Sequence, residues 1–110
     1  MIKEIVGHPD YYITDYGEVF KKDEYGVHKA TVNMSNGHAR VSIDGSNYYV
    51  GKLVLENFRP CGRSDCKVFH IDNDYSNNEL NNLVWLTPSE VQLYSTYTTE
   101  YRKQILRARV

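Results

Sequence analysis

The chain lacks any apolar run long enough to cross a membrane, and charged residues stand within three positions of Met1, so neither a membrane span nor a secretory signal is visible. Internal repeats and low-complexity tracts are also absent. Hydrophobic residues make up 41% and charged residues 25% of the 110 positions, which is ordinary for a globular protein and argues against disorder. We therefore expect a cytoplasmic chain with one small domain or two interlocked subdomains.

An excess of basic residues, the usual mark of a protein that binds duplex DNA, is missing because the formal net charge is −1. The net charge is −3 over residues 1–25 and +3 over residues 26–68, residues 69–90 carry four acids and no base, and residues 91–110 carry +3. Any anion-binding face should therefore use the middle segment and the C-terminal tail. The basic residues concerned, which are equally compatible with ordinary solvated charges, are Lys29, Arg40, Lys52, Arg59, Arg63, Lys67, Arg102, Lys103, Arg107 and Arg109.

Cysteine is scarce, with only Cys61 and Cys66 present. Together with His70 they form a C-x4-C-x3-H pattern, but a structural zinc site needs four ligands and no fourth is obvious. We expect reduced thiols, and neither a zinc site nor a disulfide. The other histidines are isolated along the chain and are expected to be surface or hydrogen-bonded residues: His8, His28 and His38.

Tyrosine is abundant, with ten residues. Its side chain can stack on nucleic-acid bases, but more commonly it fills strands and half-buried cores. Short runs rich in Tyr, Ile, Val and Thr occupy the first half, separated by turn residues at 15–17 and 35–37. Apolar and polar residues alternate over residues 39–44, and Asp44-Gly45 offers a tight hairpin turn before residues 48–50. The first half therefore predicts an antiparallel meander.

Helical signals follow. Residues 51–58 place Leu53, Val54, Leu55 and Phe58 on one face, and Pro60 ends the segment. After an Asn-rich loop, Thr87-Pro88-Ser89-Glu90 predicts a helix start, with Thr87 as N-cap and Glu90 completing a capping box. The apolar face would comprise Val91, Tyr94, Tyr101 and Ile105, with weak helix formers at 95–99 as a potential break. The fold class is α+β.

Three segments share an order with one known family. In residues 70–87, His70 is followed by Asn77-Asn78, Asn82-Leu83 and Trp85; residues 48–58 read YYVGKLVLENF, and residues 11–20 read YYITDYGEVF. These segments resemble the core, the preceding helix and the N-terminal DNA-binding module of phage HNH homing endonucleases. The resemblance implies a β-rich endonuclease-associated module over residues 1–47, and an HNH-like ββα-metal (His-Me finger) core with a C-terminal helix over residues 48–110.

By that resemblance, His70 would be the general base that activates water beside a divalent cation, and Asn82 would pin the loop that carries it. The family's two metal-ligand positions hold Phe69 and Val91, whose side chains supply no oxygen ligand to Mg²⁺ or Mn²⁺. Asp72 or Asp74 could replace them only in a rearranged loop. We therefore expect no metal or other cofactor, with Mg²⁺ or Mn²⁺ only if the protein is active.

Two further departures concern phosphate contacts. Gly51-Lys52 stands where the family's helix has His-Arg, which keeps a charge but loses the planar guanidinium. Glu18 stands where the N-terminal module usually has a basic residue, and a carboxylate there would repel a DNA backbone. Together with the acidic loop, these substitutions weigh against duplex cleavage.

The resulting hypothesis is a phage-encoded, catalytically degenerate relative that acts in the host cytoplasm by binding a nucleic acid, as a regulator, or a small nucleotide or host defence protein, as a counter-defence factor. Homo-oligomer formation stays open. The alternative is a metal-dependent nicking endonuclease with His70 as base. Candidate ligand or phosphate contacts are Arg40, Lys52, Arg59, His70, Asn77 and Asn78, although Asn73, Asn77 and Asn78 are equally suited to shaping a loop.

Overall fold

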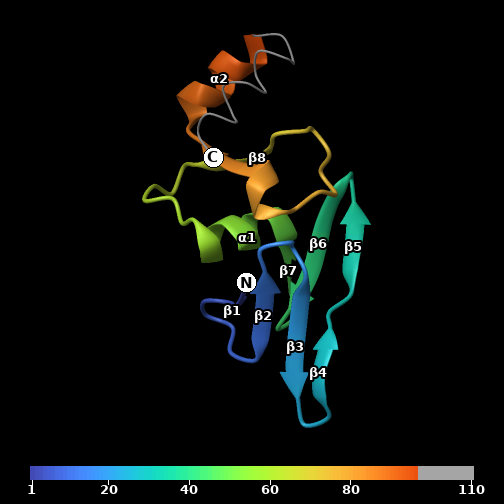
Figure 1. The fold of residues 1–110 in the computed structure, drawn as a ribbon. Coiled ribbons are helices and arrows are strands. Elements are labelled where there is room, and N and C mark those ends of the chain that lie inside the picture. Colours follow the sequence, from blue (N-terminus) through green and yellow to red (C-terminus); the bar gives the residue numbers. More distant parts are fainter. Residues whose placement is uncertain (97–110) are drawn as a thin grey trace.

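The computed structural model describes the backbone of residues 1–96 and the side chains of residues 1–92. Its first part holds two antiparallel sheets (Figure 1). One contains β1 (Ile2–Glu4), β2 (Tyr11–Thr14), β3 (Val19–Asp23) and β4 (Gly26–Lys29), and the other contains β5 (Val32–Ser35), β6 (His38–Ile43) and β7 (Ser46–Tyr49). The rest comprises α1 (Val50–Phe58), β8 (Lys67–His70), the 3-10 turn η1 (Leu80–Asn82), β9 (Leu83–Leu86) and α2 (Pro88–Thr96). The α+β class is confirmed.

Turn chemistry sets the register of the second sheet. Asn36-Gly37 and Asp44-Gly45 all have positive φ, between 51° and 84°, which is the backbone of the tight two-residue turns that match strand twist. The second turn places Val41 opposite Tyr48 and Arg40 opposite Tyr49. The hairpin that the alternation of residues 39–44 predicts is therefore present.

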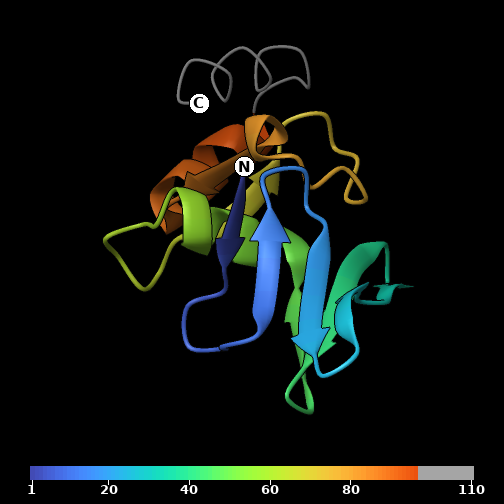
Figure 2. The same ribbon diagram turned by 60° about the horizontal axis from the view of Figure 1, so that its bottom comes forward.

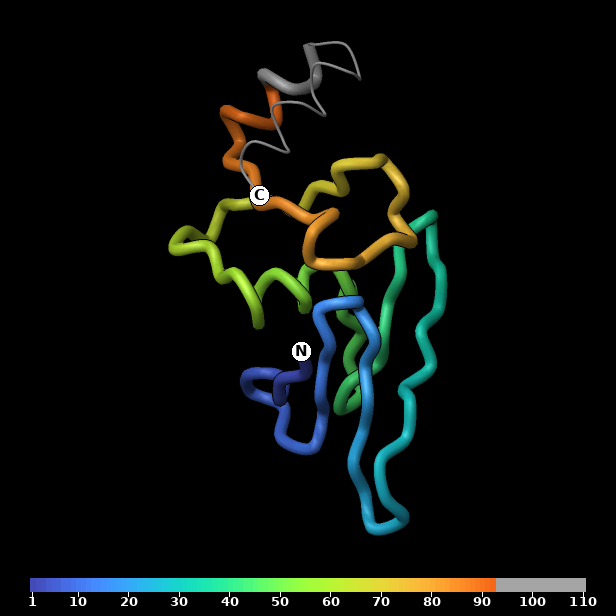
Figure 3. Tube along the Cα trace, in the orientation of Figure 1, coloured from blue at the N-terminus to red at the C-terminus, as the bar shows by residue number. Residues whose placement is uncertain are grey.

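Helix α1 lies between the N-terminal sheets and the hairpin of β8 and β9, as the trace in Figure 3 shows. It begins one residue before the predicted segment and ends at Phe58, as Pro60 predicts. Its buried face, which includes Leu53, Val54 and Leu55, joins a core cluster with Ile13, Val19, Val41 and Ile43 from the sheets and Leu83 from β9. One core therefore contains residues from both sides of position 47. The division into parts at 1–47 and 48–110 stays a prediction.

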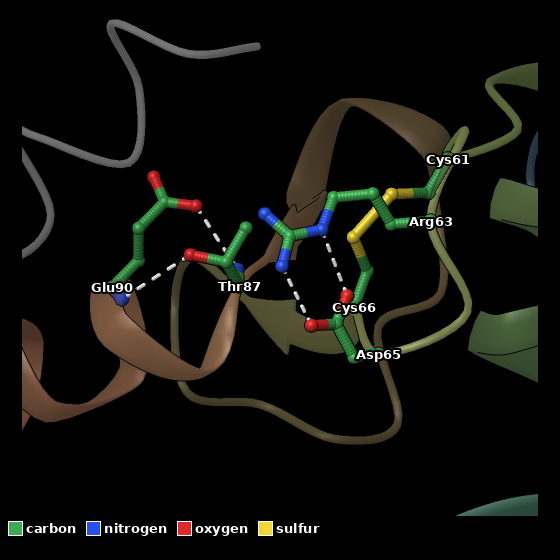
Figure 4. Close-up of polar contacts among 6 residues, drawn as sticks. All are labelled: Cys61, Arg63, Asp65, Cys66, Thr87 and Glu90. Carbon is green, nitrogen blue, oxygen red and sulfur yellow. Dashed lines mark hydrogen bonds and ion pairs between the residues drawn. A yellow bond between two sulfur atoms is a disulfide. The ribbon is translucent and has the colours of Figure 1, made fainter.

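The N-terminus of α2 is capped as predicted. The backbone N–H of Thr87 donates to Glu90 Oε1 at 2.9 Å, and the backbone N–H of Glu90 donates to Thr87 Oγ1 at 3.4 Å (Figure 4). This reciprocal pair satisfies two of the N–H groups that the start of a helix leaves without partners. Of the expected apolar face, Tyr101 and Ile105 lie outside the described residues, and so does the side chain of Tyr94.

The two cysteines differ from the prediction. The sulfur atoms of Cys61 and Cys66 are bonded as a disulfide in the loop that connects α1 to β8, so the prediction of reduced thiols is wrong for this structure (Figure 4). The same loop holds Arg63 and Asp65 in a two-point ion pair. None of the described helices has the length and apolar character needed to span a membrane.

Candidate functional site

A cavity of about 560 Å³ lies where β6, β7, α1, the β8–β9 hairpin and the loop after β8 meet. Ring-bearing side chains dominate its lining: His38, Tyr49, His70, Tyr75 and Trp85. Lys52 from α1 and Lys67 from β8 add positive charge, and Asn78 and Gly51 complete the wall near His70. Figure 2 shows the loop after β8 on the same side as the β5–β6 hairpin, which is why residues far apart in the chain share this space.

His70 is the buried polar centre of the cavity, with 7% of its surface exposed. Its Nε2 lies 2.8 Å from Asn78 Oδ1, so with that oxygen as acceptor Nε2 carries the ring proton. Burial lowers the pKa of His70 and the nearby His38 lowers it further, while the bond to Asn78 and the charges of Asp72 and Asp74 oppose the shift. Desolvation prevails, so His70 is neutral near pH 7.

Asn78 is held between two glycines. A Cβ on Gly51 would lie 2.9 Å from Asn78 Oδ1, and a Cβ on Gly17 would lie 2.9 Å from Asn78 Cβ. Gly17 also has φ of +85°, a conformation that favours glycine. The turn at residues 15–17 is further fixed by a bond from Leu80 N–H to Asp15 C=O at 2.8 Å. Both glycines therefore permit the close packing that places the Asn78 amide on His70.

Asn82 ties the loop after β8 into one piece. Its Nδ2 donates to Asp72 Oδ1 at 2.9 Å and to Asn77 C=O at 2.8 Å, and its Oδ1 accepts from Asp72 N–H at 3.1 Å. Asp72 also accepts from Asn77 Nδ2 at 2.9 Å, and Asp74 accepts from Ser76. Burial is the largest single effect on the pKa of Asp72 and raises it, but the hydrogen bonds from Asn77, Asn82 and the Asp74 N–H together outweigh it, so the pKa lies below its ordinary value. The carboxylates of Asp72 and Asp74 therefore stabilise the loop through hydrogen bonds with residues of the same loop.

The two positions expected to hold a metal carry apolar side chains, and these side chains also pack against apolar neighbours. Phe69 and Val91 both pack against a cluster of Ile71, Val84 and Leu86. Among the described residues, no group of three His, Cys, Asp or Glu side chains is arranged to hold a metal ion. Since a hard divalent cation needs oxygen ligands, the residues present do not fit it.

A row of rings connects the second sheet to His70. His38 stacks on Tyr75 with the ring centroids 4.6 Å apart. The rings of Tyr75 and His70 form a T-shaped pair at 5.3 Å, and those of His38 and Tyr49 form another at 5.6 Å. At the outer end, the Arg40 guanidinium lies 4.9 Å from the Tyr49 ring centroid and donates to its hydroxyl at 2.9 Å. The row of rings forms one wall of the cavity.

The structure brings some predicted contacts together and separates others. Lys52, His70 and Asn78 line the cavity, whereas Asn77 is committed to Asp72 and Arg40 is attached through Tyr49. Arg59 is exposed at the end of α1, where its C=O accepts from Trp85 Nε1 at 2.7 Å. Glu18 lies 3.4 Å from Lys29 in an exposed ion pair. The basic tail, Arg102, Lys103, Arg107 and Arg109, lies outside the described residues.

Apart from His70, sequence reasoning missed the ring residues that line the cavity: His38, Tyr49, Tyr75 and Trp85. His38 was expected to be an isolated surface residue, yet it stacks on Tyr75. Of the other histidines, His8 lies 3.0 Å from Asp44 and His28 lies 3.2 Å from Asp23. For the tyrosines of the cavity the signal was their abundance, and local patterns do not say which tyrosines converge.

The order β8, η1, β9 and α2, with a buried histidine at the end of β8 and an asparagine-anchored loop after it, places the chain among structures with an HNH-like fold. Among solved structures, it is similar to one described as "DNA binding and cleavage by the HNH homing endonuclease I-HmuI", with a TM-score of 0.73 and 25% sequence identity. The similarity covers 96% of this chain, which spans 65% of that one. No known protein-family profile and no curated protein matches the chain.

Proposed function

We propose that the chain derives from an HNH homing endonuclease with a ββα-metal core and binds a nucleic acid or nucleotide-type ligand at the cavity without cutting it. The observation that carries this proposal is the packing of Phe69 and Val91 into the cluster of Ile71, Val84 and Leu86. Oxygen ligands at these positions would have to replace buried apolar contacts. Hydrolysis that depends on a divalent cation would therefore lack its metal ligands, although the neutral His70 and the loop that Asn82 holds remain.

Binding is supported by what surrounds His70. The similar I-HmuI structure is described in terms of DNA binding, and here Lys52 and Lys67 place positive charge beside aromatic rings in the cavity. The net charge of −1 and the acids at 72, 74 and 79 oppose broad contact with a duplex backbone, whereas a small ligand needs only a few local donors. A phage-encoded regulator or counter-defence factor in a host cell fits this pattern.

The test is a nicking assay with supercoiled plasmid and Mg²⁺ or Mn²⁺, run beside a His70→Ala variant and an exposed His28→Ala control. We expect no cation-dependent nicking by any of the three. Nicking by the native chain and the His28 variant that disappears with His70→Ala would show that a divalent site forms after all, and the proposal would be wrong. A gel-shift assay and a thermal-shift assay with nucleotides on the same samples measure the binding itself.

A further inference from the structure

We propose that the cavity recognises one unpaired nucleotide, with its base stacked on the Tyr75–His38 ring pair and its phosphate beside Lys67 and Lys52. This inference rests on the proposed function, because it assigns the ligand of the same cavity. This nucleotide can be a free nucleotide or an unpaired nucleotide within a single strand. A base inside a duplex is stacked and paired, so it would not present its face to the ring pair.

The ring pair is suited to stacking because its two rings are already stacked and Tyr75 remains accessible. Tyr75 remains 46% exposed although it stacks on His38 and forms a T-shaped pair with His70. Tyr49, which contacts the His38 ring, is 45% exposed. The ring contacts of Tyr75 with His38 and His70 are already present within the protein itself. Every base offers a flat face, so such a ring pair favours bases in general over one sequence.

The cations of the cavity are available for a phosphate. No ion pair among the described residues involves Lys67, and Lys52 has only a long contact of 3.8 Å with Glu56 on the exposed side of α1. The acids of the neighbouring loop are engaged, Asp72 with Asn77 and Asn82 and Asp74 with Ser76. The cavity volume of about 560 Å³ lies in the range of small-ligand sites.

Trp85 supplies a direct reporter, because it lines the cavity and is the only tryptophan in the chain. The native chain is titrated with adenosine 5′-monophosphate, adenosine, ribose 5-phosphate and inorganic phosphate while Trp85 fluorescence is recorded. We expect a saturable change with adenosine 5′-monophosphate, a weaker one with adenosine, and none with the two probes that lack a base. A single-stranded oligonucleotide and the matching duplex distinguish the sources, and the duplex should leave Trp85 unchanged.

Variants separate stacking from charge. Tyr75→Leu should weaken adenosine 5′-monophosphate binding about tenfold, as loss of a stacking aromatic does. The matched control is Tyr25→Leu, because Tyr25 is 81% exposed in the β3–β4 turn and does not line the cavity. Lys67→Gln should weaken binding of the nucleotide and leave that of adenosine unchanged. Thermal unfolding of each variant confirms that it is folded.

Each outcome decides the matter. Equal responses to ribose 5-phosphate and to the nucleotide, or unchanged affinity in Tyr75→Leu, would overturn the inference. No Trp85 response to any nucleotide, with a duplex gel-shift retained, would overturn it while the proposed binding function stands. If neither nucleotides nor nucleic acids bind, both proposals fail together.

Discussion

At the scale of single residues, the site depends on how His70 is surrounded. Its imidazole is buried, its Nε2 is bonded to Asn78 Oδ1, and Asn78 reaches it because Gly51 carries no side chain. In the family that the chain resembles, that position of the helix normally holds a histidine. Glycine at this position thus leaves room for the side-chain amide of Asn78, which is hydrogen-bonded to Nε2 of His70. Two predictions follow from this geometry.

The stability of the protein should fall as the pH drops below the ordinary histidine range. Burial lowers the pKa of folded His70 below its unfolded value of about 6.5, so the unfolded chain binds the proton more readily. The stabilisation is complete above that unfolded pKa and is lost as the pH falls through the lowered folded pKa. Asp72, whose pKa is also lowered, stays ionised in this window. Urea unfolding from about pH 7.5 to about pH 5.5 should show a steeper loss for the native chain than for His70→Gln. Parallel slopes would contradict the assignment.

Gly51→Ala should destabilise the protein by about 1–3 kcal/mol, the cost of disturbing a buried hydrogen bond. Glycine to alanine inside a helix otherwise stabilises by up to about 1 kcal/mol, so the sign of the change is diagnostic. The new Cβ would lie 2.9 Å from Asn78 Oδ1 and displace the amide from His70. Gly62→Ala is the matched control, because nothing lies within 4 Å of a Cβ there. Urea midpoints measure both, and a stabilised Gly51→Ala variant would contradict the packing described.

At the scale of elements, local chemistry decided boundaries well. Pro60 and the capping box place the end of α1 and the start of α2, and Asp44-Gly45 sets the β6–β7 register. The reason is that caps, tight turns and proline act within a few residues. The partner of an element is different, since it depends on residues far away. The ring row between β6 and the loop after β8 is such a case, and His38 was misjudged for that reason.

Thr87→Ala should lower the free energy of unfolding by about 1 kcal/mol, because it removes the oxygen that accepts from Glu90 N–H at the start of α2. The exposed Ser89→Ala, in the same turn, is the control and should change stability only slightly. Chemical denaturation of the three proteins side by side provides the comparison. Equal effects of the two substitutions would show that the cap contributes nothing of its own.

At the scale of the whole molecule, one core joins the sheets, α1 and β9. Leu55 on α1, with 1% of its surface exposed, sits in this shared cluster. The chain should therefore unfold as one unit, although the sequence resemblance predicts parts at 1–47 and 48–110.

Leu55→Ala should cost about 2–5 kcal/mol, as truncation of a buried leucine does. Far-UV circular dichroism, which follows the strands and helices, and Trp85 fluorescence, which follows the cavity, should shift together in the variant. Two separate transitions, with the strand signal lost at a different denaturant concentration from the Trp85 signal, would instead support independent parts at 1–47 and 48–110.

The sequence by itself determined the fold class, the helix and hairpin boundaries and the apolar identity of Phe69 and Val91, because these follow from local backbone preferences and from side-chain chemistry. Only the tertiary structure decided how Phe69 and Val91 pack and what lines the space around His70. Packing brought His38, Tyr75 and Trp85 from three segments to one cavity, and it tied Asn77 and Asp72 into their own loop. Contacts between distant segments depend on how the whole core packs, and no short stretch of sequence contains that information.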